Sequence, residues 1–137
     1  MLGVNAEAFL ELTLAFAVTR LPEKLYFRLL GLTPVAAGAG APGDPEGAEV
    51  FAGQVVGDAV ARMAARVPFR ALCLQQSIAV HRMLRRRGVA SAIVFGLRPA
   101  GGAGRDDLAH AWVTVRGSTV SGLIEDLESY AVLARYG

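Results

Sequence analysis

Two residues of the chain have the side-chain chemistry of a nucleophile and its base. Cys73 is the single cysteine and opens a segment with helical periodicity. His110 stands near the start of residues 109–115, an apolar segment with the pattern of a strand. A thiolate is a strong nucleophile, and a helix N-terminus or a nearby imidazolium stabilises it. Because cysteine and histidine need to be close only in space, the pair predicts an enzyme with a covalent cysteine mechanism.

Each of these residues also has a purely structural interpretation. A buried cysteine is usually an inert small hydrophobe, although the position of Cys73 at a helix start favours catalysis. Trp112 is expected to share a sheet face with His110, and it either shields that ring from water or belongs to the core. His81 lies roughly 12 Å from Cys73 along the same predicted helix and is expected to be structural. One cysteine and two histidines show no paired ligand spacing, so we expect no metal and no other cofactor.

The elements that must position this pair are predicted from periodicity and from glycine and proline. In chain order they are one or two helices in 6–31 broken near Pro22, a helix in 49–66 stopped by Pro68, a helix in 73–87 ended by Gly88, strands in 91–97 and 109–115, a turn at Arg116-Gly117 and a returning strand at 119–121. Residues 123–136 have a mixed pattern, from which we predict a short helix. Helices followed by a small antiparallel sheet predict an α+β fold.

We expect one compact domain with three parts. Residues 1–33 form an N-terminal helical region, residues 34–48 a linker rich in glycine, alanine and proline, and residues 49–137 the core that carries both candidate residues. The helical region holds more apolar surface than one helix face needs. This surplus indicates core packing, or else docking on a partner protein or a membrane surface.

Composition and charge exclude several classes of protein. Hydrophobic residues make up 53% and charged residues 19%, which excludes an intrinsically disordered chain. A net charge of +2 is too small to indicate nucleic-acid binding, and the arginines within residues 82–87 are expected at the dipole-favoured end of a helix. A single cysteine favours a reducing compartment, the cytoplasm. The apolar stretch Ala8–Val18 is shorter than the roughly 20 residues of a membrane span, and Glu7 and Glu11 argue against a signal peptide, so membrane association is not expected.

Three runs of the sequence carry a family resemblance. They are VPFRALCLQQSIAVHRMLRRRG at 67–88, IVFGL at 93–97 and LAHAWVTVRG at 108–117. In this order and spacing they resemble the lasso-peptide leader peptidases, small transglutaminase-like cysteine proteases of bacterial natural-product gene clusters. The match covers residues 50–121. It implies a transglutaminase-like core, with the cysteine at a helix N-terminus packed on a small antiparallel sheet.

The resemblance also implies a mechanism and partners. Cys73 would attack the peptide carbonyl at the leader–core junction of a ribosomal precursor peptide, and His110 would take the thiol proton and later protonate the leaving amine. Backbone N–H groups of Leu72 and Cys73 would hold the oxyanion. Proteins of this family work with a leader-binding partner protein and with a separate ATP-dependent lasso cyclase, which uses the freed amine to close a macrolactam.

The chain departs from the family pattern at the residue that orients the histidine. The family has an acid about twelve positions after the histidine, and here that position is Gly122. The nearest acids are Glu125 and Asp126. Asp126 is our candidate for the missing acid, with Glu125 as its rival. Otherwise Ser121, a backbone carbonyl or water must orient His110. The departure keeps two other functions open, namely amide transfer or deamidation with the same pair, and a non-catalytic peptide-binding module of the same fold.

Overall fold

A computed structural model of the chain describes residues 3–35, 47–98, 109–124 and 127–137. Within these ranges the fold is α+β, as predicted, and combines helices with one antiparallel sheet. The elements are α1 (Val4–Val18), α2 (Glu23–Leu30), α3 (Ala48–Ala64), α4 (Cys73–Arg86), β1 (Ala92–Leu97), β2 (Ala109–Val115), β3 (Ser118–Ser121), the 3₁₀ turn η2 (Leu127–Ser129) and β4 (Ala131–Tyr136).

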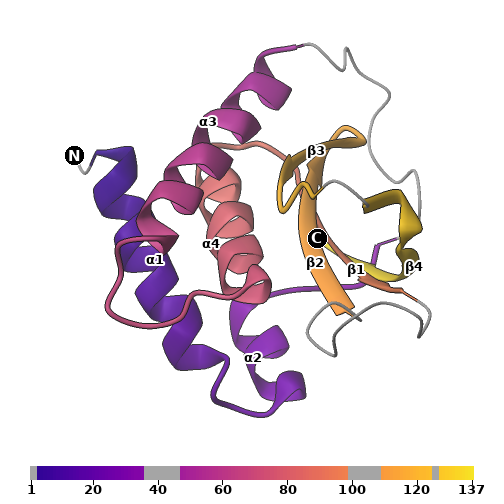
Figure 1. Cartoon of the computed structure of the whole chain (residues 1–137), viewed down its shortest axis with the longest axis horizontal. Helices are drawn as coiled ribbons and strands as arrows, with labels where there is room; N and C mark the ends of the chain where they lie inside the picture. Colours follow the sequence, from indigo (N-terminus) through magenta and orange to yellow (C-terminus); the bar gives the residue numbers. More distant parts are fainter. Residues whose placement is uncertain (1–2, 36–46, 99–108, 125–126) are drawn as a thin grey trace.

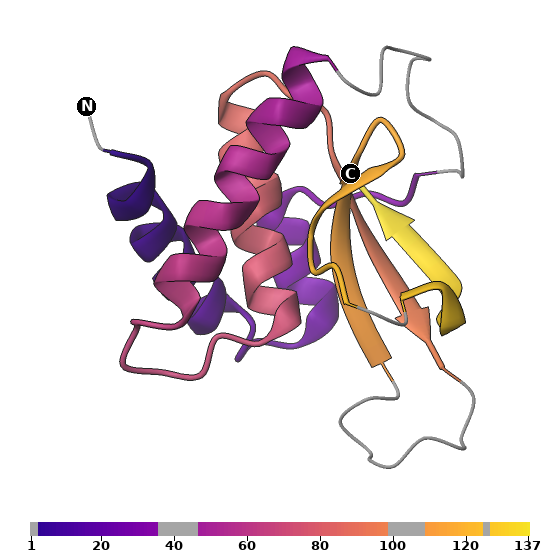
Figure 2. The ribbon, with the colours of Figure 1, turned by 45° about the horizontal axis from the view of Figure 1, so that its top comes forward.

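The elements form three layers (Figure 1). The sheet has the strand order β3-β2-β1-β4. Helices α3 and α4 pack on one of its faces, and α1 packs on the far side of those two helices. Figure 2 shows α1, the α3–α4 pair and the sheet in succession across the molecule. Helix α4, which carries Cys73, is therefore the central element of the core.

Buried residues divide between the two faces of the sheet. Ile93, Val113 and Val115 face the helices and belong to the main core, whereas Val94 and Trp112 form a second cluster with Tyr130. Neighbouring residues of β1 and β2 alternate between these clusters, as the two-residue period of a strand requires. The sheet is consequently buried on its helical face and partly covered on its other face.

Close backbone contact joins α3 to the edge strand β3. A Cβ atom built on Gly57 would lie 2.0 Å from the carbonyl oxygen of Val120, and one built on Gly53 would lie 2.8 Å from a Val120 methyl group. The two glycines stand four residues apart and so lie on the same helix face. They bring the α3 backbone against β3 and fix the position of that strand.

The C-terminal segment is a strand, and the prediction of a short helix there is wrong. Among the described residues of this segment only η2 has a helical turn, and β4 pairs antiparallel with β1. The sequence AVLARY of β4 lacks a two-residue alternation and contains good helix formers. Its strand conformation comes from pairing with β1, which is a tertiary contact and leaves no local pattern.

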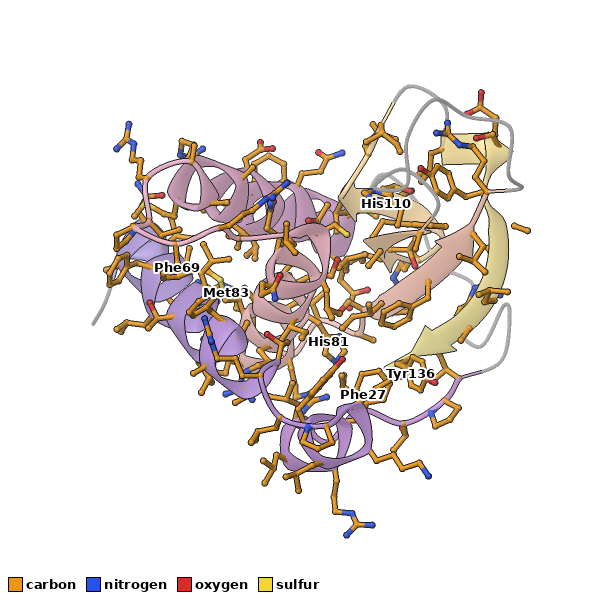
Figure 3. All side chains as sticks on the ribbon, turned by 60° about the horizontal axis from the view of Figure 1, so that its bottom comes forward. Phe27, Phe69, His81, Met83, His110 and Tyr136 are labelled. Carbon is orange, nitrogen blue, oxygen red and sulfur yellow. The ribbon has the colours of Figure 1, made fainter. Side chains whose placement is uncertain are left out.

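The N-terminal helices belong partly to the core and partly to the surface. Ala8, Leu12 and Ala15 of α1 are fully buried. Phe27 of α2 contacts the ring of Tyr136, with centroids 4.7 Å apart, and Figure 3 shows these two rings side by side near the end of the sheet. Large apolar side chains of both helices are nevertheless exposed: Phe9, Leu10, Leu14, Leu25 and Leu29. Residues 36–46 of the expected linker lie outside the described ranges.

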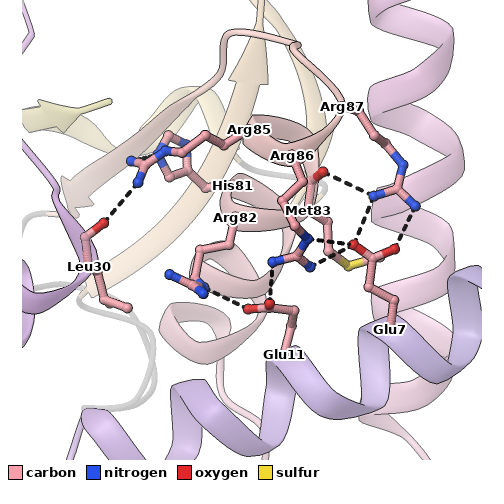
Figure 4. A network of polar contacts seen from close by, with 9 residues as sticks. All are labelled: Glu7, Glu11, Leu30, His81, Arg82, Met83, Arg85, Arg86 and Arg87. Atoms are coloured by element: carbon pink, nitrogen blue, oxygen red, sulfur yellow. Dashed lines mark hydrogen bonds and ion pairs between the residues drawn. The ribbon is translucent and has the colours of Figure 1, made fainter. Parts of the chain in front are cut away.

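An ion-pair network ties α1 to α4 (Figure 4). Glu7 accepts hydrogen bonds from Arg86 and Arg87, and Glu11 from Arg82 and Arg86, with the closest atoms 2.5 to 2.7 Å apart. These hydrogen bonds, Arg87 first, hold the pKa of Glu7 down at about 2. The arginines at the C-terminal end of α4 therefore form ion pairs with carboxylates of α1. These ion pairs add to the favourable interaction with the helix dipole that was expected from the sequence.

In the described part of the chain no helix combines the length and the apolar character that crossing a membrane requires.

Candidate active site

Cys73 is the first residue of α4 and is half-buried. Helix α1 holds the segment that leads into it. The ring of Phe69 stacks on Phe16 with centroids 4.5 Å apart, and Gln75 donates a hydrogen bond to Thr19 Oγ1 at 3.0 Å. The thiol thus sits in the first turn of a helix that is fixed from two sides, where the peptide dipoles favour an anion.

His110 is the second residue of β2, and its ring is held from three directions. Nε2 lies 2.6 Å from the carbonyl oxygen of Gly122. The ring stacks on Trp112 at 5.8 Å between centroids and lies 5.7 Å from the ring of Tyr130. A carbonyl oxygen can only accept, so Nε2 carries the proton and Nδ1 presents its lone pair. This is the tautomer in which Nδ1 can act as a base.

The topology brings the nucleophile and the base to the same end of the molecule. Strand β2 runs antiparallel to β1, which follows α4 after a short connection, so β2 runs in the direction of α4. Figures 1 and 2 show the first turn of α4 and the start of β2 at one end. The His110 ring lies on the Trp112 face of the sheet, whereas α4 covers the other face. The two residues therefore lie toward the same end of the molecule, with His110 on one face of the sheet and α4 on the other.

No hydrogen bond joins the Cys73 sulfur to the His110 ring in the described ranges. Hydrogen bonds of catalytic pairs are often long in the absence of substrate and tighten when it binds. The structure thus supplies a nucleophile and a base at one end of the fold, with the base already oriented.

A main-chain group occupies the place of the orienting acid. Gly122 lies twelve residues after His110, where the family pattern has an acid, and its carbonyl accepts the Nε2 hydrogen bond. This is the backbone-carbonyl alternative named in the sequence analysis. Glu125 and Asp126 lie outside the described residues, so their predicted roles stay predictions. Ser121 ends β3 and is half-buried, and its side chain makes no hydrogen bond to His110 in the described part of the structure.

Gly122 leaves no room for a side chain. Its φ is +81°, and an added Cβ would lie 2.8 Å from Trp112 Cβ and 2.9 Å from the Ala111 carbonyl oxygen. An aspartate here would have to displace the backbone of β2, the strand that carries His110. The local conformation that requires a glycine at position 122 therefore also places its carbonyl against His110.

The likeness to known proteins extends over most of the chain. A family model described as the transglutaminase-like superfamily matches residues 14–135. The chain belongs to the transglutaminase-like superfamily. Neither a curated protein nor a solved structure matches it significantly. The superfamily generally includes cysteine proteases and acyltransferases, both built on a cysteine nucleophile.

In this transglutaminase-like protein the backbone at the start of α4 limits the oxyanion site. The N–H of Leu72, which was predicted from the sequence to be an oxyanion donor, already donates a hydrogen bond to Gln75 Oε1 at 3.1 Å. Cys73 N–H belongs to the first turn of α4, where amides have no partner within the helix. The amide of Cys73 is therefore the better of the two predicted donors.

His81 is a structural residue remote from the candidate pair. Arg85 donates to its Nε2 at 2.9 Å, so Nδ1 carries the proton and donates to Ser91 Oγ at 2.7 Å. Burial, followed by the charges of Arg85 and Arg82, lowers the pKa of His81 to about 4. Figure 3 shows His81 in the interior of the molecule and His110 at the end of the sheet. In the described ranges no group of three or more His, Cys, Asp or Glu residues could hold a metal ion.

Sequence reasoning missed two parts of the site. The Gly122 carbonyl has no side-chain signature, and only the absence of an acid at that position pointed to it. Tyr130 contacts His110 from the turn between η2 and β4, a region whose strand was not predicted. Trp112, in contrast, was correctly placed on the His110 face. It is 6% exposed, so it both belongs to a core cluster and covers the ring.

Proposed function

We propose that this transglutaminase-like protein is a cysteine peptidase that removes the leader from a ribosomally made lasso-peptide precursor. The observation that carries the proposal is the hydrogen bond from His110 Nε2 to the Gly122 carbonyl, because it leaves Nδ1 free to accept the proton of a thiol. The resemblance of residues 50–121 to lasso-peptide leader peptidases supplies the substrate class. Cleavage would free the core N-terminus for macrolactam formation by a separate ATP-dependent cyclase.

Each residue has one task in this reaction. His110 Nδ1 removes the proton of the Cys73 thiol, and the thiolate attacks the carbonyl carbon of the leader–core bond. The amide N–H of Cys73 stabilises the oxyanion of the tetrahedral intermediate. The imidazolium then gives its proton to the leaving amine, and water releases the leader from the thioester. The Gly122 carbonyl and the Trp112 ring keep His110 in one orientation throughout.

Two partners belong to the proposal. A leader-binding protein delivers the precursor and supplies a high local concentration of it, and the cyclase consumes the product. The single thiol of the chain fits a reducing compartment, and we place the reaction in the cytoplasm.

Amide transfer or deamidation is the second candidate, because the superfamily also includes acyltransferases and uses the same nucleophile. Mass spectrometry of the products separates the two. Peptidase action gives two peptides, whereas deamidation converts an amide into an acid and leaves the backbone intact. A pH-dependent rate of Cys73 alkylation would separate both from a non-catalytic peptide-binding module.

Replacement of the nucleophile tests the peptidase proposal directly. Cys73→Ala should lower the rate of precursor cleavage by about a thousandfold or more, because the covalent step is lost. Cys73→Ser should be nearly as inactive, because an alcohol is a far weaker nucleophile than a thiolate. Both variants should unfold within a few degrees of the parent protein, since Cys73 is only half-buried. Full cleavage by a folded Cys73→Ala protein would exclude this mechanism.

A further inference from the structure

An open cleft is lined by the two aromatic residues that contact the His110 ring. It has a volume of about 1140 Å³, and Trp112 and Tyr130 are among the residues that line it. Both rings are buried residues that also contact His110. Residues of η2 and of the start of β4 also line the cleft. Figure 2 shows these two elements on the side of the sheet away from α3 and α4. The cleft therefore shares Trp112 and Tyr130 with the surroundings of the candidate base and lies outside the helical core.

The lining of the cleft is apolar and incompletely covered. Leu123 is 72% exposed and Val132 is 41% exposed. Leu127 packs against the cluster that contains Trp112 and Tyr130. Glu128 is the one ionisable carboxylate among its described lining residues, and it is exposed. Such a surface gains free energy when an apolar side chain covers it, by roughly 25 cal/mol for each Å² removed from water.

Size and distance identify the occupant. The cleft exceeds the roughly 300–1,000 Å³ of ordinary small-molecule pockets, so it accommodates a peptide segment better than a single small group. The ring centroids of Trp112 and His110 lie 5.8 Å apart, which is less than two extended residues span at about 3.3–3.6 Å each. A side chain that contacts Trp112 would therefore lie near the candidate base.

We infer that this cleft is the specificity site for the peptide substrate, and that it binds one large aliphatic or aromatic side chain of that peptide near the scissile bond. The inference rests on the proposed peptidase function. Glu128 adds a preference for a basic over an acidic residue next to that side chain, because an acidic neighbour would face a like charge.

Trp112 makes the inference measurable, because it is the only tryptophan of the chain. In a Cys73→Ala background, blocked pentapeptides acetyl-Gly-Gly-Xaa-Gly-Gly-amide are titrated against Trp112 fluorescence, with Xaa as Leu, Phe or Ser. The Leu and Phe peptides should bind at least about tenfold more tightly than the Ser peptide. Leu123→Ser should reduce this ratio to about threefold or less. Leu133→Ser is the matched control, because Leu133 is 63% exposed and does not line the cleft.

A second variant tests the charge. Glu128→Lys should reverse the preference between peptides that carry Lys or Asp next to the Leu residue, and it should leave the Leu-to-Ser ratio unchanged. Equal affinity for the Leu and Ser peptides, or an unchanged ratio in a folded Leu123→Ser protein, would overturn the inference. Failure of the proposed function is a separate result. A protein with intact Cys73 that binds the Leu peptide as expected but cleaves no precursor even with the leader-binding partner present would refute the peptidase, and the cleft would stand as a peptide-binding site.

Discussion

A single glycine couples backbone shape to the chemistry of His110. Gly122 has a positive φ, touches the backbone of β2 and offers its carbonyl to the imidazole Nε2. An orienting carboxylate would add a negative charge beside the imidazolium, whereas a carbonyl adds only a dipole. We expect the carbonyl to fix the orientation of the ring through this hydrogen bond.

Gly122→Ala tests this role at the level of one residue. A positive φ costs a non-glycine residue about 1–2 kcal/mol, and the contacts with Ala111 and Trp112 add an overpacking cost of about 1–3 kcal/mol. Cleavage should fall about tenfold or more even where the variant is folded, because the ring loses its anchor. Thermal unfolding and kcat/KM at a temperature well below the unfolding transition measure the two effects.

Gly117→Ala is the control for backbone strain. Its φ is +84°, yet no atom lies within 4 Å of an added Cβ. This variant should lose stability and keep its activity. If both variants retain full activity while folded, the Gly122 carbonyl does not orient the base, and Asp126 or Glu125 regains that role.

Helix-to-helix contacts decide where the nucleophile lies. Helix α1 reaches α4 at both ends, through Gln75 and Thr19 beside Cys73 and through the ion pairs of Glu7 and Glu11 at the other end. The N-terminal helices thus act as a frame for α4. Their removal would release the element that carries the thiol.

Glu7→Gln measures how much the ion pairs between α1 and α4 contribute to stability. The variant should be less stable than the parent by about 1–2 kcal/mol near neutral pH, because Glu7 is mostly buried and accepts hydrogen bonds from two arginines. The folded-state pKa of Glu7 is lowered from 4.5 to about 2. Its stabilisation is therefore fully present above pH 4.5 and is lost as the pH falls toward 2.

Urea unfolding of both proteins across that range checks the prediction. The gap between them should close on the acid side, while protonation of His81 affects both proteins alike. Glu23→Gln, at an exposed position of α2, should change stability by less than about 0.5 kcal/mol. A gap that persists unchanged to about pH 2 would contradict the assigned pKa of Glu7.

The same elements show what the sequence could predict. Both helices after the linker, the two central strands and the turn at Arg116-Gly117 have strong local patterns and were predicted nearly to the residue. Strand β4 and the Gly122 contact depend on neighbours distant in sequence, and no local pattern encodes them. The Glu7–Glu11 pair and the arginines of α4 did contain a signal. Opposite charges at four-residue spacing on two helices are typical of facing helices, but the pairing needs the tertiary fold.

The whole molecule exposes large apolar side chains on its two N-terminal helices. Leu10 and Leu14 on α1, and Leu25 and Leu29 on α2, are exposed, whereas Phe27 is packed against Phe95 and Tyr136. Sequence left open whether these helices are core or a docking surface. Each helix has one face of each kind.

Dependence on a leader-binding partner is the prediction at this scale. The chain alone should cleave the precursor slowly, and the partner should raise the rate by about a hundredfold or more through local concentration. Leu14→Glu and Leu29→Glu should reduce this gain and leave the unfolding temperature nearly unchanged, because both side chains are exposed. Cleavage rates with and without the partner provide the measurement.

Two controls define the outcome. Phe51→Glu alters an exposed side chain of α3 and should keep the full gain, whereas Phe27→Glu should unfold the protein. If the isolated chain cleaves the precursor as fast as the mixture does, the partner is unnecessary. If Phe51→Glu is the only variant in which the partner no longer raises the cleavage rate, the partner docks on α3 instead.

The carbonyl beside His110 also affects how proteins of this kind are classified. A motif search that requires cysteine, histidine and an acid would reject this chain at Gly122 and record a pseudoenzyme. Yet the main chain supplies the hydrogen bond that the motif assigns to a side chain. A glycine with a positive φ that places its carbonyl against the histidine is thus a feature to look for where the acid is missing. Surveys of inactive relatives should therefore compare backbone acceptors around the histidine before they count lost residues.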